Sequence, residues 1–228
     1  GLIISVPKTE YMTANCHPQP SLQVYGEPIN HVTDFKYLGS KMASAASDFK
    51  RRKALAWSAF WKLERLWRSP QLTISAKVNL FYTTCVTILL YGCESWVLSQ
   101  DMESKINSFA TSCYRIMLNI KRKDRVSNTI IHAMTNTKPL VHCVRKRQLG
   151  FLGHILRLPE EEPARRYALY IPSHGKRRPG RPRTSYLAYI QHMLGYDENE
   201  MAAEEIVTLA KDRCAWRKLV IACSAAEE

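Results

Sequence analysis

The side chains in this sequence that are best suited to chemistry are clustered cations, which bind phosphate groups. Lys and Arg gather in runs within the middle of the chain and are not spread evenly along it. Such side chains contact phosphate oxygens through charge and reach, without reading base edges. The candidate nucleic-acid-binding residues are Lys50, Arg51, Arg52 and Lys53; Lys121, Arg122, Lys123 and Arg125; Arg145, Lys146 and Arg147; and Lys176, Arg177, Arg178, Arg181 and Arg183.

The excess of positive charge is local. The chain carries 33 Lys and Arg against 20 Asp and Glu, a formal net charge of +13. Residues 1–44 hold three side chains of each sign, whereas residues 121–183 hold sixteen basic and four acidic side chains. Residues 184–228 reverse the balance, with four basic and eight acidic side chains. This segregation predicts a polyanionic partner for the middle of the chain.

Histidine and cysteine residues do not form a recognisable metal site. The seven cysteines are scattered without a C-x-x-C pair, which predicts reduced thiols in an intracellular protein. His142, Cys143 and His154 fit no common zinc spacing, and no second cysteine pair completes four ligands. We therefore expect that the chain itself binds no metal and no cofactor.

A basic segment rich in Pro and Gly, residues 174–183, cannot form a helix. An extended arm with five cations suits a narrow groove of DNA, where the negative potential is enhanced. The G-R-P-R string is similar to the core of an AT-hook, although Pro179 stands where the leading Arg is usual. A nuclear-import signal and a basic linker are the alternative interpretations.

Helices are expected to position most of these cations. Residues 72–98 are apolar around most of a helix circumference, which predicts the buried centre of a bundle. Amphipathic patterns at 47–67 and 101–120 predict one helix on each side of it. Lys77 and Glu94 bracket too short an apolar run for a membrane span. The expected helix caps are Ser47, Thr73 and Ser99.

The two ends of the chain carry further elements. A short β-like run at 22–25, turned by residues 26–28, predicts a β-hairpin. A short helix is expected at 127–134, and another is expected to begin at Pro139, because Pro favours the first helical position. Two more helical patterns cover residues 186–194 and 201–221.

Several strings resemble non-LTR (LINE-type, RTE-like) retrotransposon endonuclease–reverse transcriptases, and they occur in that family's order. Each string alone is weakly specific, but the occurrence of all of them in the family's order makes the resemblance specific. Residues 1–12 are similar to motif D, with Ser5 in place of Asn, and residues 35–39 are similar to the motif E primer grip. Residues 77–81 and 89–96 (L-L-Y-G-C-E-S-W) are similar to the thumb. Three strings are similar to the C-terminal region: 147–157 (R-x-L-x-x-x-G-H-x-x-R), 180–183 (G-R-P-R) and 210–217 (A-x-D-R-x-x-W-R).

The resemblance implies an RNA-directed DNA polymerase whose metal-binding aspartates lie upstream, in motifs A and C. The present sequence holds no Y-x-D-D string, and two-metal phosphoryl transfer needs carboxylates to hold Mg²⁺. We therefore expect no catalytic residue and no polymerase activity in this chain alone. By resemblance, Lys8 matches the motif D lysine, and the primer-grip residues are Phe35, Tyr37, Leu38 and Gly39.

The prediction is a mainly α fold with a small N-terminal β-hairpin, a three-helix thumb-like bundle and a helical basic C-terminal region. The expected boundaries are 1–43 for a palm remnant, 44–120 for the thumb and 121–228 for the C-terminal region with its arm. The start at Gly1 within an apolar run is interpreted as a cut inside a larger domain.

By resemblance, the chain is expected to bind RNA template, DNA primer and target DNA, with Mg²⁺ serving the intact polymerase. An upstream palm is expected to pack on residues 1–43. The expected location is nuclear and cytoplasmic, with the nucleus favoured, and no membrane is involved. A domesticated DNA- or RNA-binding module and a truncated, non-functional relic are the alternatives.

The basic arm yields the first testable prediction. Replacing Lys176, Arg177, Arg178, Arg181 and Arg183 by Ala should weaken duplex DNA binding and flatten its salt slope by about 2–4 units, because each phosphate contact contributes roughly −0.9. Fluorescence anisotropy over a salt series on AT-rich and GC-rich duplexes measures both effects. We expect binding to weaken equally on the two duplexes, because Pro179 replaces the leading Arg of the AT-hook core. An unchanged affinity and slope would show that the arm is a linker or an import signal.

Overall fold

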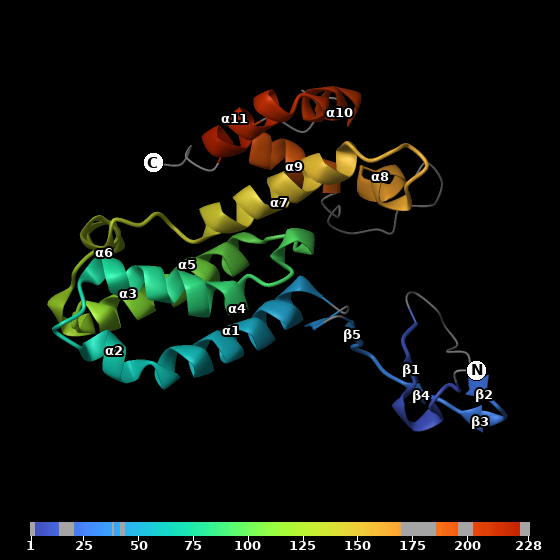
Figure 1. The fold of residues 1–228 in the computed structure, drawn as a ribbon, viewed down its shortest axis with the longest axis horizontal. Coiled ribbons are helices and arrows are strands. Elements are labelled where there is room, and N and C mark those ends of the chain that lie inside the picture. Colours follow the sequence, from blue (N-terminus) through green and yellow to red (C-terminus); the bar gives the residue numbers. More distant parts are fainter. Residues whose placement is uncertain are drawn as a thin grey trace, which may run out of the picture.

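The computed structural model describes residues 3–13, 21–37, 39–41, 44–169, 186–195 and 203–223. Helices make up most of this part of the chain, and the strands described are short and lie toward the N-terminus (Figure 1). The mainly α fold predicted from the sequence is confirmed.

The N-terminal part consists of short strand pairs beside the helical body (Figure 1). Strands β1 and β4 pair in parallel, whereas β2–β3 and β5–β6 are antiparallel hairpins. Tyr25 (φ 54°) and Gly26 (φ 80°) form the two-residue turn of β2–β3 with positive φ at both positions, as tight hairpins prefer. The elements are η1 (Val6–Lys8), β1 (Glu10–Tyr11), β2 (Gln23–Val24), β3 (Glu27–Pro28), β4 (Asn30–His31), β5 (Lys36–Tyr37) and β6 (Ser40–Lys41).

The thumb-like part contains the helices expected from the apolar patterns, with one cap displaced. The Thr73 and Ser99 hydroxyl oxygens accept hydrogen bonds from the backbone N–H groups of the first turns that follow them, as predicted. The first helix is capped by Ser44, whose Oγ accepts from the Ser47 N–H at 3.1 Å, so Ser47 was the wrong cap. The elements are α1 (Ala45–Lys62), α2 (Glu64–Arg68), α3 (Ile74–Phe81), η2 (Tyr82–Val86), α4 (Thr87–Leu89), η3 (Cys93–Ser95) and α5 (Gln100–Met117).

The central helix is shorter and less regular than predicted. A continuous helix was expected over residues 72–98, but α4 ends at Leu89 and Gly92 adopts a left-handed φ of 73° before a 3₁₀ turn. Before that break, η2 is π-helical, and the Thr84 hydroxyl donates to the Leu80 carbonyl at 2.6 Å. Glycine accommodates this backbone conformation at little cost, which periodicity of apolar residues does not reveal.

The C-terminal part is organised along α7. This helix lies between the thumb-like helices and the last three helices (Figure 1) and packs against η3, α10 and α11. It begins at Val141, two residues after the expected start at Pro139. The elements are η4 (Arg122–Asp124), α6 (Asn128–Thr135), α7 (Val141–Leu156), α8 (Pro163–Ala168), α9 (Tyr186–Leu194), α10 (Ala203–Lys211) and α11 (Arg213–Cys223).

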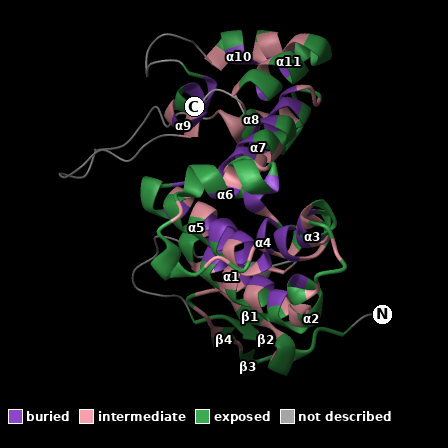
Figure 2. Ribbon diagram, turned by 90° about the vertical axis from the view of Figure 1, so that its left-hand side faces the viewer, coloured by how far each residue is buried: buried purple, intermediate pink, exposed green. Residues whose placement is uncertain are grey.

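One hydrophobic cluster runs through the helices, from Phe49 in α1 to Val220 in α11. Buried residues fill the interior and exposed residues cover the outer sides (Figure 2). The cluster continues across position 120, where a boundary was expected between the thumb and the C-terminal region. Within the described residues, no helix is both long enough and apolar enough to cross a membrane.

Phe81 provides a test of this packing. The side chain is fully buried, and its ring lies 5.4 Å from Tyr114, 6.1 Å from Phe109 and 6.3 Å from Phe60 between ring centroids. Phe81→Ala should lower the free energy of unfolding by about 3–5 kcal/mol, because it removes a buried ring and leaves a cavity. Ile130→Ala, at a side chain 51% exposed, is the matched control. Denaturant unfolding measures both, and a loss below about 1 kcal/mol for Phe81→Ala would contradict the packing.

Candidate nucleic-acid interface

The four consecutive cations of α1 separate into two pairs with different surroundings. The Arg51 Nη1 donates to the Gly39 carbonyl at 2.7 Å, and Arg52 donates to the same carbonyl. The Arg52 guanidinium also lies over the Tyr91 ring, 4.2 Å from its centroid, and only 7% of the residue is exposed. These two arginines hold the β5–β6 turn against α1, so their structural role makes them poor candidates for phosphate contact.

Lys50 and Lys53 lie on the other side of α1, next to two tryptophans. Lys50, Trp57 and Trp61 follow one another at seven- and four-residue spacing, which places them on one helix face. The Trp61 ring is stacked on Trp57, with centroids 6.1 Å apart and 18° between planes, and Trp61 is 47% exposed. We call Lys50, Lys53, Trp57 and Trp61 the α1 outer face. It offers charge and flat aromatic surface side by side.

The residues that resemble motifs D and E lie in the N-terminal part. Lys8 is exposed at the end of η1, and Phe35 is half-buried. Gly39 has a φ of 85° and closes the turn between β5 and β6, as expected of a hairpin there. Leu38 and the Tyr37 side chain lie outside the described residues.

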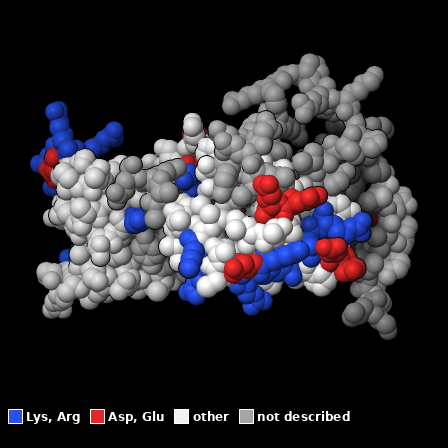
Figure 3. Space-filling model, turned by 90° about the horizontal axis from the view of Figure 1, so that it is seen from above, with Lys and Arg blue, Asp and Glu red and all other residues white. Residues whose placement is uncertain are grey.

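The cations that precede α6 form an exposed turn. Lys121, Arg122, Lys123 and Arg125 are all exposed around η4. The Asp124 carboxylate accepts from the Lys121 N–H at 2.7 Å and thereby fixes the turn. Viewed from above the C-terminal helices, a group of Lys and Arg side chains protrudes at one end of the molecule (Figure 3).

The three cations at the middle of α7 point in different directions. Arg145 is 8% exposed and forms hydrogen bonds of 3.1 and 3.2 Å with the Glu103 carboxylate of α5. The Arg147 Nη1 donates to the Leu90 carbonyl at 3.0 Å. Lys146, between them, is exposed. Arg145 and Arg147 therefore join α7 to the thumb-like helices, and Lys146 alone of the three is placed for an external partner.

Gln148 follows these cations and is almost fully buried, with 1% exposed. Its Nε2 donates to the carbonyls of Cys93 and Trp96, at 3.1 and 2.6 Å. Its Oε1 accepts from the Tyr189 hydroxyl of α9 at 2.8 Å. Burial raises the pKa of Tyr189 to about 12, so the phenol stays protonated and donates at neutral pH.

The strings at 147–157 and 210–217 meet and serve packing. The Trp216 Nε1 of α11 donates to the Leu149 carbonyl at 2.9 Å, and its indole lies where a Cβ on Gly153 would be. The Arg157 Nη1 donates to the Ala210 carbonyl at 2.9 Å. Gly153 therefore allows α7 and α11 to pack closely, and Trp216 anchors that contact.

Asp212 begins α11 within the same string. Its Oδ1 accepts from the backbone N–H groups of Cys214 and Ala215, at 2.8 and 3.1 Å. These hydrogen bonds stabilise the carboxylate and lower the pKa of Asp212. The aspartate therefore acts as a helix cap, and its position is explained without a ligand.

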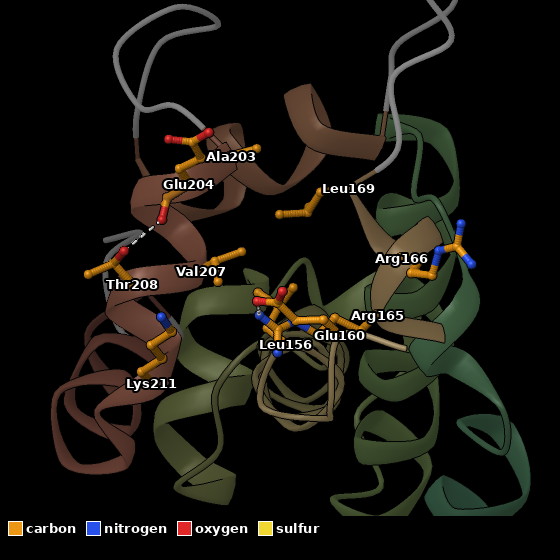
Figure 4. A pocket seen from close by; sticks show the side chains of 10 residues that line it. All are labelled: Leu156, Glu160, Arg165, Arg166, Leu169, Ala203, Glu204, Val207, Thr208 and Lys211. Atoms are coloured by element: carbon orange, nitrogen blue, oxygen red, sulfur yellow. Dashed lines mark hydrogen bonds and ion pairs between the residues drawn. The ribbon is translucent and has the colours of Figure 1, made fainter. Parts of the chain in front are cut away.

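A hollow of about 330 Å³ opens between the end of α7, α8 and α10 (Figure 4). Its walls mix apolar side chains such as Val207 with both signs of charge. Arg165 is engaged within the protein, because it donates to the Leu158 carbonyl at 2.6 Å and to Glu160 at 2.8 Å. The Arg166 guanidinium points away from the middle of the hollow (Figure 4). The arrangement therefore concentrates no charge of one sign.

Reactive or metal-binding chemistry has little support in the described part of the chain. The six cysteines described there are free thiols. Burial raises the pKa of Cys93 to about 12 and also raises that of Cys113, so both thiols stay protonated at neutral pH. Among the same residues, no group of three or more His, Cys, Asp or Glu side chains could hold a metal ion.

The remaining cationic segment, residues 174–183 with Lys176, Arg177, Arg178, Arg181 and Arg183, lies outside the described residues. Over the face formed by the C-terminal helices, Lys and Arg side chains lie among Asp and Glu side chains (Figure 3). This mixture of charge makes that face a poorer site for a polyanion than the α1 outer face or the η4 turn.

Sequence patterns did not predict two features of these helices. Trp57 is half-buried and packs against Phe109, whereas Trp61 is exposed; their four-residue spacing beside Lys50 and Lys53 could have indicated this face. Gln148 gave no such signal, because its partners lie at least 41 residues away along the chain.

The chain is similar to an uncharacterized transposon-derived protein of Caenorhabditis elegans. The two are 24% identical over 234 residues, which cover 96% of this chain and 83% of the relative. No family model and no solved structure matches the chain. The similarity extends over nearly the whole chain and indicates an origin in a transposable element.

Two glycines of α7 test the contact between the C-terminal strings. Gly153→Ala should lower the free energy of unfolding by about 1–3 kcal/mol, because the added methyl group displaces the Trp216 indole. Gly150→Ala, on the same helix, adds a methyl group into open space and should raise stability by roughly 0.5–1 kcal/mol. Thermal or denaturant unfolding compares the pair. Equal effects of the two substitutions would contradict the α7–α11 contact.

Proposed function

We propose that this chain is the C-terminal, nucleic-acid-binding part of a non-LTR retrotransposon reverse transcriptase, an RNA-directed DNA polymerase. In that role it binds the template–primer duplex and the target DNA. The resemblance of strings in family order supports the proposal, and so does the similarity to a transposon-derived protein over 96% of the chain.

The α1 outer face is the main structural support for this proposal. Lys50 is exposed and Lys53 is half-buried, whereas their neighbours Arg51 and Arg52 hold the Gly39 turn. Ammonium groups on flexible stems contact phosphates as point charges, and the Trp61 ring offers a surface for sugars or bases. A helix of this composition follows a nucleic-acid backbone without reading its sequence.

Two further groups of cations extend the same surface in the proposal. The η4 turn presents Lys121, Arg122, Lys123 and Arg125, and α7 presents Lys146. The arm at 176–183 would add contacts to target DNA. Binding by separated groups of cations is dominated by release of counterions, so its affinity depends steeply on salt.

In this proposal, the phosphoryl-transfer step takes place in another part of the polymerase, outside this chain. Phosphoryl transfer needs carboxylates that hold Mg²⁺. No group of acidic side chains in the described residues has that arrangement. The chain's own contribution is to hold and orient the duplex. An upstream palm would pack on residues 1–43, next to Phe35 and the Gly39 turn, and target DNA would be met in the nucleus.

Charge removal on α1 tests the proposed function. Lys50→Ala/Lys53→Ala should weaken binding of an RNA–DNA duplex on every sequence and reduce the salt slope by about 1–2 units, because roughly one counterion is released per phosphate contact. Lys105→Ala/Lys138→Ala removes the same charge from exposed positions on α5 and before α7 and serves as the control. Fluorescence anisotropy over a salt series measures both variants.

The proposal predicts that the control variant keeps the wild-type slope within about half a unit. If the two double variants lose affinity equally, binding reflects net charge and the α1 outer face has no special role. If the wild-type chain binds no duplex even at low salt, the proposed function is wrong.

A further inference from the structure

The strings at 89–96 and 147–157 meet along a groove that neither packing nor the proposed duplex contacts explain. The buried residues of both strings have a structural role, because they pack in the core or take part in the Gln148 hydrogen bonds. Their exposed and half-buried members line an open hollow of about 570 Å³. We call it the Phe151 groove. It is lined by Glu94 and Ser95 of η3 and by Lys146, Arg147, Gly150 and Phe151 of α7.

The groove is held open by the main chain and by buried bonds. Gly92 adopts a left-handed φ of 73° and turns η3 away from α4. Arg147 and Gln148 hold that turn against α7 through the carbonyls of Leu90, Cys93 and Trp96. At Gly150, a Cβ would meet no atom within 4 Å, so the floor of the groove is empty at this point. These bonds join the two segments that line the hollow.

The chemistry of the lining fits one unpaired nucleotide. Phe151 is 46% exposed and presents a flat ring on which a base can stack. Lys146 is exposed on the preceding turn of the helix, where its ammonium group can reach a phosphate. Glu94 and Ser95 supply acceptors across from them, and a carboxylate accepts well from the exocyclic amine of cytosine.

We propose that the Phe151 groove binds an unpaired nucleotide of a single-stranded segment, by stacking on Phe151 with its phosphate on Lys146. The inference rests on the proposed function, because it assigns a second, single-stranded segment of the same nucleic acid to this protein. Glu94 in the groove favours a base that carries an amine over thymine or uracil. A carboxylate would add nothing to a surface that bound phosphate alone, since it would repel the anion.

The test uses the full chain with short fluorescein-labelled oligo(dC) and oligo(dT), and with an RNA–DNA duplex. Gly150→Leu fills the groove from a position with open space, and Phe151→Ala removes the stacking ring. Both should weaken oligo(dC) binding by roughly 5- to 150-fold, the range that base stacking spans, and change duplex binding by less than about twofold. Glu94→Gln should reduce the preference for oligo(dC) over oligo(dT).

The control is Tyr167→Ala, at an exposed aromatic residue on α8. Thermal unfolding confirms that each variant is folded, and the control should bind oligo(dC) as the wild type does. If Gly150→Leu and Phe151→Ala bind oligo(dC) with wild-type affinity, the inference is wrong. A protein partner is then the alternative occupant of the groove. Equal losses on oligo(dC) and duplex would also overturn the inference. Absence of all wild-type binding would overturn the proposed function as well.

Discussion

The buried side-chain amide of Gln148 is the constraint on which the arrangement of this protein depends. It satisfies two carbonyls of the 93–96 turn and accepts from the Tyr189 hydroxyl, so α7, the turn and α9 share one set of bonds. The Trp96 Nε1 donates to the Asp48 carboxylate at 3.2 Å and extends the set to α1. Each partner left unpaired in this interior would cost about 1–3 kcal/mol, so the segments are held in one register.

Among the candidate cations, arginine and lysine take different roles. Arg51, Arg52, Arg145, Arg147 and Arg157 each bind a carbonyl or a carboxylate of a distant segment. The guanidinium has several donors in a rigid fork and suits such contacts, whereas the ammonium of Lys50 and Lys146 is strongly hydrated and these residues are exposed. Away from the η4 turn, the phosphate-binding capacity of the described candidate residues therefore rests on lysines. A run of cations in the sequence therefore contains residues that bind other segments of the protein and residues that face solvent.

Sequence patterns predicted the parts of the fold that depend on local chemistry. Thr73 and Ser99 cap helices because their hydroxyls accept from the backbone of the following turn, and Phe81 is buried because it lies on the apolar face of its helix. The break at Gly92 was missed because apolar residues continue beyond it. The inward roles of Arg52 and Arg145, and the groove beneath Phe151, depend on which segments meet. Periodicity identifies a helix face but not its partner.

In the proposed function, nucleic acid lies along the α1 outer face, the η4 turn and the Phe151 groove, and avoids the C-terminal helices. Lysine acetylation followed by mass spectrometry, with and without an RNA–DNA duplex carrying a single-stranded overhang, tests this most directly. We expect protection of Lys50, Lys53, Lys121, Lys123 and Lys146, with unchanged reactivity of Lys105, Lys138, Lys211 and Lys218. Protection confined to Lys211 and Lys218, or equal protection of every lysine, would contradict it.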